Sequence, residues 1–287
     1  MTKNTAKQTK TCHSRDHWIT LNGQVLPPAE KDSTGNRHVK AIPRPMITRQ
    51  ANYPTGCDIP MHSHRWGQLL SITEGLIHVE VKGVGHWVVP PHRAVWIPAF
   101  IEHDSKAVNS ISMQNIYIEP SLHPHLPDQC QVIAITPLLR ELISAVVQLD
   151  TLYDEQGSDG RLVQVMLDQL QSIPQQPLHL PLPSHKALLK MANALIKCPQ
   201  DNKSLEEWAA KLAFSERTLA RYFKKETGMT FGQWRQQARL LAAISFIAAG
   251  KSISCIAQDL GYNNQSAFIA MFKKALGKTP AKYFDVE

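Results

Sequence analysis

The sequence has no hydrophobic run long enough to cross a membrane. Its longest nearly apolar stretch is Leu240–Ala249, whereas a spanning helix needs roughly 20 residues. The first ten residues are polar, include lysines and lack the apolar segment of a secretory signal. We therefore expect a cytoplasmic protein without a membrane partner.

Cysteine is scarce and scattered. The five cysteines are Cys12, Cys57, Cys130, Cys198 and Cys255, and no C-x-x-C pair occurs. An odd, widely spaced set favours reduced thiols in a cytoplasm over a disulfide framework. The G-x-S-x-G pattern is also absent and no Ser/His/Asp set is recognisable, so a hydrolase has no support.

Charge and histidine are divided unevenly along the 287 residues, a length that predicts about two domains. Residues 184–287 contain 16 Lys plus Arg against 8 Asp plus Glu, while residues 1–183 contain 15 against 16. Of the 13 histidines, only His185 lies beyond residue 183. The basic part is either a candidate for a polyanion partner or a well-solvated helical domain.

Five segments follow from composition and periodicity. Residues 1–40 are predicted to be an arm, and 41–135 a small antiparallel barrel, because short Val/Ile/Trp-rich runs such as "IHVEV" alternate between glycines and prolines. Residues 136–173 predict a helical hairpin, and 174–183, with four prolines, an extended linker. Residues 184–287 read as helices. The expected fold class is therefore mixed, with a β-barrel and an all-α domain.

The hairpin begins at a threonine cap, Thr136, followed by a proline at the first helical position. Its apolar residues recur at helical spacing: Leu138, Leu139, Leu142, Val146 and Leu149. This stripe indicates either packing onto the barrel or a dimer interface.

The basic segment contains a helix, a short turn and a second helix that ends in glycine. "SLEEWAAKLA" opens with a capping box, Ser215 caps "ERTLARYFKKET", and Gly228 ends it. This is the helix-turn-helix pattern. Arg217, Arg221 and Lys224 share one face of the second helix at i, i+4, i+7. Such a face suits either a major groove or plain solvation.

The pattern returns 49 residues later in "SISCIAQDLGYNNQSAFIAMFKKALG". Between the two copies, residues 230–249 predict one uninterrupted helix, which at about 1.5 Å per residue spans roughly 30 Å. Successive major-groove faces lie about 34 Å apart. Two recognition helices joined by such a rod could enter adjacent grooves, which favours a DNA-binding domain.

The combination "RYFKKETG", "IAQDLGY", "MFKKALG" and "TPAKYF" resembles the AraC/XylS family of bacterial transcription regulators over residues 184–285. The resemblance implies two helix-turn-helix units that read DNA near a promoter. The residues expected at the DNA surface are Ser215, Glu216, Arg217, Ala220, Arg221, Lys224, Asn264, Gln265, Ser266, Ala267, Ala270, Lys273 and Lys274.

Two positions depart from the family pattern. Ala270 stands where the second recognition helix usually carries an arginine, and Phe284 replaces the arginine that usually follows the closing tyrosine. A methyl group cannot donate a hydrogen bond, so we expect the first unit to dominate base readout. The second would then contribute mainly phosphate contacts, through Asn264, Lys273 and Lys274.

A histidine-rich stretch lies in the predicted barrel. Gly56, His62, His64, Gln68 and Gly75 have the spacing of the first cupin motif, which has glutamate at the place of Gln68. Cupin enzymes hold a transition metal with three histidines and that glutamate. Neutral imidazoles are good ligands for such metals, but an amide is a weaker ligand than a carboxylate.

The second cupin motif is weaker. It appears as Pro98-x-Phe100-x-x-His103, with phenylalanine in place of glycine, and Ala107 stands where an asparagine is usual. Three interpretations remain open: an effector-binding barrel, a retained divalent transition metal, and a structural histidine cluster. The expected effector pocket comprises His62, His64, Trp66, Gln68, Trp96 and His103. The candidate metal ligands are His62, His64, Gln68 and His103.

Together these features predict a non-enzymatic, sequence-specific transcription regulator that responds to a small-molecule effector in its barrel. We expect a homodimer formed through residues 136–173 that binds double-stranded DNA, controls a nearby transporter or metabolic operon, and contacts RNA polymerase if it is an activator. The alternative is a metal-dependent cupin enzyme fused to a DNA-binding domain.

Overall fold

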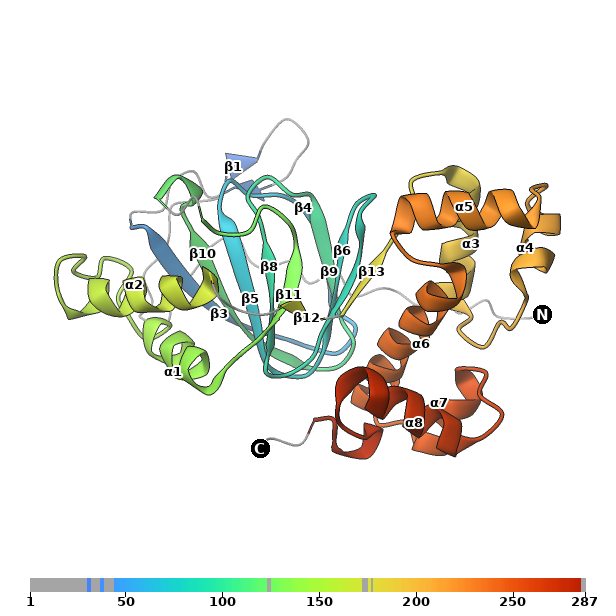
Figure 1. Ribbon diagram of the computed structural model, residues 1–287. Helices are drawn as coiled ribbons and strands as arrows, with labels where there is room; N and C mark the ends of the chain where they lie inside the picture. Colours follow the sequence, from blue (N-terminus) through green and yellow to red (C-terminus); the bar gives the residue numbers. More distant parts are fainter. Residues whose placement is uncertain are drawn as a thin grey trace, which may run out of the picture. The chain divides into compact units, whose positions relative to one another are not determined.

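The computed structural model describes residues 30–31, 37–38, 44–122, 125–171, 175–176 and 178–284. Most of the predicted arm, 1–40, lies outside them; only its short antiparallel strands β1 (Glu30–Lys31) and β2 (Arg37–His38) are described. The chain divides into two compact units (Figure 1). One comprises Met1–Val79 and Val89–Pro177, and the other comprises Glu80–Val88 and Leu178–Glu287.

The predicted antiparallel barrel is confirmed as two sheets. Their strands are β3 (Met46–Tyr53), β4 (Asp58–His62), β5 (Gly67–Glu74), β6 (Ile77–Val81), β7 (Gly85–Val89), β8 (Arg93–Ile97), β9 (His103–Ala107), β10 (Ile111–Ile118), β11 (Gln131–Ala134), β12 (Gln175–Gln176) and β13 (His179–Pro181). The strand orders are β12-β11-β8-β5-β10-β3 and β13-β7-β6-β9-β4. Burial alternates along "IHVEV" in β6 as period-2 strand geometry requires, because Ile77, Val79 and Val81 point inward.

The helical hairpin consists of α1 (Pro137–Val146) and α2 (Ser158–Gln171). The threonine cap is as predicted, because Thr136 Oγ1 accepts a hydrogen bond from the Leu139 amide at 3.2 Å. Leu139, Leu142 and Val146 are buried in one core cluster with the sheet residue Trp96. The hairpin therefore packs onto the sheet, which was the first of the two interpretations of its apolar stripe.

The second unit contains the six helices α3 (Lys186–Lys197), α4 (Leu205–Lys211), α5 (Glu216–Thr227), α6 (Phe231–Ala248), α7 (Ile253–Asp259) and α8 (Gln265–Leu276). The long helix predicted over 230–249 is α6, with Thr230 as its cap. Trp234 on α6 lies edge-on to Phe223 of α5, and Phe268 on α8 contacts Phe272. All four aromatic side chains are fully buried, so aromatic contacts centre the packing at α5–α6 and within α8.

Of the cysteines, Cys130, Cys198 and Cys255 are free thiols. Burial raises the pKa of the Cys130 thiol to about 12. Cys57 is fully buried and disulfide-bonded, so the expectation of reduced thiols is wrong for this residue; an odd number of cysteines still allows a pair. Among the described residues, none of the helices is both long and apolar enough to pass through a membrane.

Candidate DNA-binding surface and barrel pocket

The first helix-turn-helix unit is α4, a short turn and α5. Ser215 begins α5 as its cap, and its Oγ accepts a hydrogen bond from the Thr218 amide at 3.2 Å. The turn is tight because Ala213 adopts a left-handed conformation, with φ of 58°. Leu219 and Phe223 on the inner face of α5 are buried, which fixes the orientation of the outer face.

The outer face of α5 is exposed and cationic. Arg217, Arg221 and Lys224 are exposed and Ala220 is partly buried between them. They line a hollow of about 530 Å³ together with Leu205, Thr230, Phe231 and Gly232. Four of the six residues predicted in the first unit therefore line one concave, positively charged surface, which suits the backbone and base edges of DNA, whereas Ser215 and Glu216 do not line it.

The second helix-turn-helix unit consists of α7, a turn and α8. Asn264 caps α8, because its Oδ1 accepts a hydrogen bond from the Ala267 amide at 2.8 Å. Glycine supplies the left-handed turn residue here, with φ of 74° at Gly261. The residues of α8 predicted at the DNA surface are all exposed, and so is Ala275; the predicted ones are Gln265, Ser266, Ala267, Ala270, Lys273 and Lys274. The first four carry no charge.

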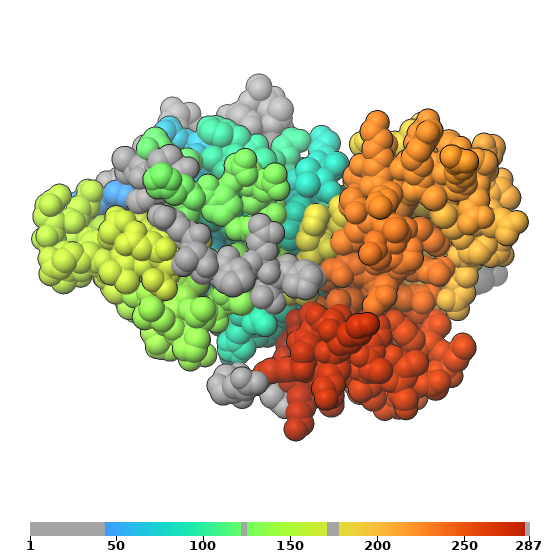
Figure 2. All heavy atoms as spheres, in the orientation of Figure 1, coloured from blue at the N-terminus to red at the C-terminus, as the bar shows by residue number. Residues whose placement is uncertain are grey.

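Helix α6 connects the two helix-turn-helix units (Figure 1). Its 18 residues span about 27 Å at 1.5 Å per residue. Figure 2 shows the atoms of α5 and α6 and those of α7 and α8 as two neighbouring lobes, drawn in orange and red. A rod of this length is close to the spacing of successive major grooves.

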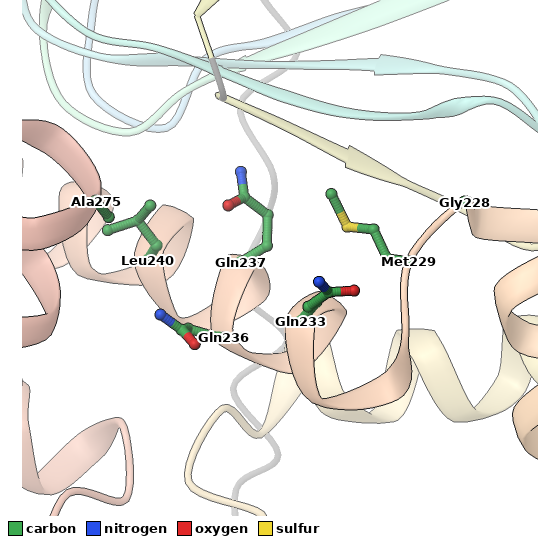
Figure 3. Close-up of a pocket in the computed structure, with 7 residues that line it drawn as sticks. All are labelled: Gly228, Met229, Gln233, Gln236, Gln237, Leu240 and Ala275. Atoms are coloured by element: carbon green, nitrogen blue, oxygen red, sulfur yellow. The ribbon is translucent and has the colours of Figure 1, made fainter.

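A second hollow on α6 was not predicted. It measures about 370 Å³, and its lining residues are Gly228, Met229, Gln233, Gln236, Gln237, Leu240 and Ala275 (Figure 3). Three glutamines and no charged group face it. The sequence signal was "QWRQQ", in which positions 233, 236 and 237 fall on one face of a helix.

In the barrel, the structure brings three predicted histidines together. His62 on β4 is paired with His103 on β9, and their ring centroids are 4.3 Å apart. The ring of His64 lies 5.1 Å from that of His103. One ligand atom from each of the three lies within 4.8 Å of the others. His103 is 1% exposed, while His62 and His64 are partly buried.

Each of these imidazoles is oriented by a backbone carbonyl. The Nδ1 atoms of His62, His64 and His103 lie 2.8, 2.7 and 2.9 Å from the carbonyl oxygens of Pro60, Trp66 and Ile101, respectively. A carbonyl only accepts, so each Nδ1 carries the proton and each Nε2 has a lone pair when the ring is neutral. This second-shell arrangement is typical of metal-binding histidines, so the three side chains fit a transition-metal ion.

Burial keeps the rings of His64 and His103 neutral. It lowers the pKa of His64 to about 4, against the opposing effect of its hydrogen bond with Gln68. Burial is also the main cause of the lowered pKa of His103, with the nearby His62 and His64 adding to the effect. Neutral imidazoles can coordinate a metal or accept hydrogen bonds from a ligand at neutral pH.

Gln68 does not stand free as a ligand. Its Oε1 is 2.8 Å from His64 Nε2, and its Nε2 donates to Asn115 Oδ1 at 2.7 Å. A neutral His64 that donates from Nδ1 offers only a lone pair to Gln68. We infer that both amides are turned by half a rotation, because Gln68 then donates to His64 and the otherwise unpartnered Nδ2 of Asn115 donates to Gln68.

One of the predicted pocket residues, Trp96, has other surroundings. Trp96 belongs to the core cluster beneath α1 and α2, and its Nε1 donates to the Pro127 carbonyl at 2.7 Å. It is paired with Leu69 rather than Gln68, so it lies on the opposite face of the sheet from Gln68. Trp66, two residues after His64, is buried. Asn115, 0% exposed, was missed, although an asparagine inside "ISMQNIYI" signals a buried polar contact.

A basic unit with two helix-turn-helix motifs, carried on the same chain as a barrel with a buried histidine cluster, is typical of a DNA-binding regulator with a ligand-binding domain. Residues 44–166 match the model of the AraC-like ligand binding domain, and residues 208–285 match that of a helix-turn-helix domain. The HTH-type transcriptional regulator NimR of Escherichia coli K12 is 41% identical over 224 residues, which is 78% of this chain and 81% of NimR. The chain belongs to the AraC family of transcriptional regulators.

Other similar proteins match a smaller part of the chain or are less similar in sequence. The regulator RipA of Corynebacterium glutamicum is 37% identical over 103 residues, covering 36% of this chain and 31% of RipA. Among solved structures, fatty-acid-bound ToxT of Vibrio cholerae is 15% identical, with a TM-score of 0.35 over 83% of this chain and 94% of ToxT. The predicted family is confirmed by the two family models and by the similarity to NimR.

Proposed function

We propose that this AraC-family regulator reads DNA mainly through α5, and that a small molecule in the barrel controls this binding. The observation that carries the first part is the exposed, concave cationic surface around Arg217 and Arg221. Arginine can bind guanine bidentately in a major groove. The uncharged outer face of α8 supports a smaller share in base readout for the second unit, with Lys273 and Lys274 on phosphates.

The proposal includes the remaining contacts expected from the family. The side chains of Ser215 and Asn264 accept the capping hydrogen bonds of α5 and α8. Their role is therefore to stabilise the first turns of these helices at the DNA backbone. Glu216, exposed at the start of α5, would contact the edge of the site. We place the protein in the cytoplasm, where its DNA lies, and assign it no catalytic role, because its relatives are transcriptional regulators.

Two further partners belong to this proposal. The hairpin leaves apolar side chains exposed, with Leu138 on α1 54% and Val165 on α2 45% accessible, which supports a homodimer contact there. Contact with RNA polymerase follows if the protein is an activator. The target is a neighbouring transporter or metabolic operon. A Leu138→Glu/Val165→Glu variant should be monomeric by light scattering; an unchanged mass would contradict this interface.

The test of DNA binding uses fluorescence anisotropy with the full chain. A duplex covering the region upstream of its own coding sequence is compared with a scrambled duplex of equal length. We expect tighter binding to the first and a steep fall in affinity with salt, because phosphate contacts release counterions. Equal affinity for the two duplexes would overturn sequence-specific recognition.

For the barrel, we propose that His62, His64 and His103 bind a divalent transition metal through their Nε2 atoms, because such an ion best matches three convergent imidazoles. The effector would then bind at this metal. When bound, such a metal supplies open coordination positions for an anionic or polar molecule. A metal on His64 Nε2 would displace the contact with Gln68, whose amide then keeps its hydrogen bond with Asn115 and is not a fourth ligand. The interpretation as a purely structural cluster is the competing outcome.

Metal analysis separates the two. The full chain is equilibrated with Co²⁺, and the metal content and visible absorption are measured. We expect about one ion per chain, lost in His103→Ala and retained in His185→Ala, whose side chain is exposed at the start of α3. Absence of cobalt from the wild type, or retention in His103→Ala, would exclude this site.

A further inference from the structure

The linker is a bonded strand rather than a free tether. Its β13 pairs antiparallel with β7, in the register His179↔Trp87, Leu180↔His86 and Pro181↔Gly85. The ladder continues at both ends, because the Val88 amide donates to the Leu178 carbonyl at 3.1 Å and the Leu182 amide donates to the Val84 carbonyl at 2.9 Å. We call residues 178–182 the linker strand.

The opposite edge of the linker strand is bonded to helix α6. Trp234 Nε1 donates to the Pro181 carbonyl at 2.7 Å, and Gln237 Nε2 donates to the His179 carbonyl at 3.2 Å. Figure 3 shows Gln237 extending from α6 toward this strand. Because alternate carbonyls of a strand point to opposite edges, those of His179 and Pro181 are free to face α6. Proline fits at this edge since no amide is needed there.

Side-chain packing reinforces both edges. Leu178, Leu180 and Leu182 are all buried. The His179 ring stacks on Trp87, with centroids 4.4 Å apart and planes inclined by 22°. A β-carbon at Gly85 would lie 2.5 Å from His179 Nε2, so only glycine leaves room for this stacked ring. The linker strand is therefore held by backbone, side-chain and ring contacts along its whole length.

We propose that the linker strand couples the β7 segment to α6, so that a change at one is transmitted to the other. Residues 80–88 belong to the same compact unit as the DNA-binding helices, although they lie nearly 100 positions earlier in the sequence. Helix α6 in turn joins α5 to α8. This goes beyond the proposed function, because it assigns the route of regulation to Trp234 and Gln237 rather than to the arm or the hairpin.

Coupling between sites is reciprocal, so DNA serves as the probe even without a known effector. Hydrogen exchange of the full chain is measured with and without the upstream duplex. We expect DNA to slow exchange at the Val88 and Leu182 amides, which lie in the β7–linker ladder. Unchanged exchange at both amides, with the duplex shown by anisotropy to be bound, would overturn the proposal. Failure of the duplex to bind at all would instead count against the proposed contact surface.

The matched variants are Trp234→Phe and Trp208→Phe. The first keeps an aromatic ring but removes the donor to Pro181; the second removes an indole N–H that has no partner among the described residues. Losing one hydrogen bond of about 1 kcal/mol corresponds to roughly five-fold faster opening. Trp234→Phe should therefore raise exchange at Leu182 about five-fold and abolish the response of Val88 to DNA. Equal exchange in the two variants would refute the role of Trp234.

Discussion

The two helix-turn-helix units share a frame but differ in the chemistry of their outer faces. Both second helices begin at a side-chain cap and end at a left-handed glycine, Gly228 or Gly277. On α5 the outer face carries Arg217 and Arg221, whereas on α8 the corresponding region is uncharged up to Lys273. The caps and the buried aromatic residues thus determine the fold of each unit. The residues on the outer face do not affect this fold, so their charge can differ between the two units.

The largest expected effect comes from removing the cation at the centre of the α5 face. Arg221→Ala should weaken binding to the upstream duplex by about 10- to 100-fold, because a bidentate arginine–guanine contact contributes about 1–3 kcal/mol. Anisotropy measures this loss. Lys190→Ala, which removes an exposed charge from α3, is the control. Equal losses in the two variants would mean that α5 acts only through general charge.

Next in size is the reverse change in the second unit. Ala270→Arg introduces a donor at the exposed centre of the α8 face, so it should tighten binding several-fold and steepen the salt dependence by about one counterion. Binding to duplexes substituted at single positions would reveal a new base preference. No change in affinity or preference would indicate that α8 does not face a groove.

A smaller effect is expected from Lys273→Ala. This lysine lies in the last turn of α8 and is exposed, and we assign it to a phosphate. Its loss should weaken binding to the specific and the scrambled duplex alike. It should also reduce the slope of the logarithm of the binding constant against the logarithm of the salt concentration by about one. A loss confined to the specific duplex would show that Lys273 takes part in base readout.

The smallest effect concerns the turns. Ala213 has a left-handed conformation in the first unit, whereas glycine occupies the left-handed position of the second, at Gly261. Left-handed backbone costs a non-glycine residue about 1–2 kcal/mol, and glycine's extra chain entropy offsets roughly half of this. Ala213→Gly should therefore raise the free energy of unfolding by less than about 1 kcal/mol in denaturant titrations. A destabilised variant would contradict this account.

The sequence predicted those features that depend on local signals. The predicted cap Ser215 gave the start of α5, the helix predicted over 230–249 begins within a residue of α6, and strict alternation identified β6. The grouping of His62, His64 and His103 also followed, from their places in the two cupin-like motifs. These features depend on residues that are near in sequence or on a motif with fixed spacing.

What could not be predicted depends on long-range pairing. Four prolines predicted an extended linker, yet β13 pairs with β7, because the ladder uses the Leu178 carbonyl and the Leu182 amide and needs no amide at Pro181. The face occupied by Trp96 depends on its register with Leu69, which one strand alone does not specify. The contact from Gln68 to Asn115 spans 47 positions, and no local pattern connects them.

We propose above that the first helix-turn-helix unit contacts bases, whereas the second contacts mainly phosphates. The most direct test measures the affinity ratio between the upstream and scrambled duplexes for two double variants, Arg217→Ala/Arg221→Ala and Lys273→Ala/Lys274→Ala. We expect the first variant to bind the two duplexes with equal affinity. The second variant should bind both duplexes more weakly but with the affinity ratio of the wild type. A ratio lost in the second variant and kept in the first would contradict the account.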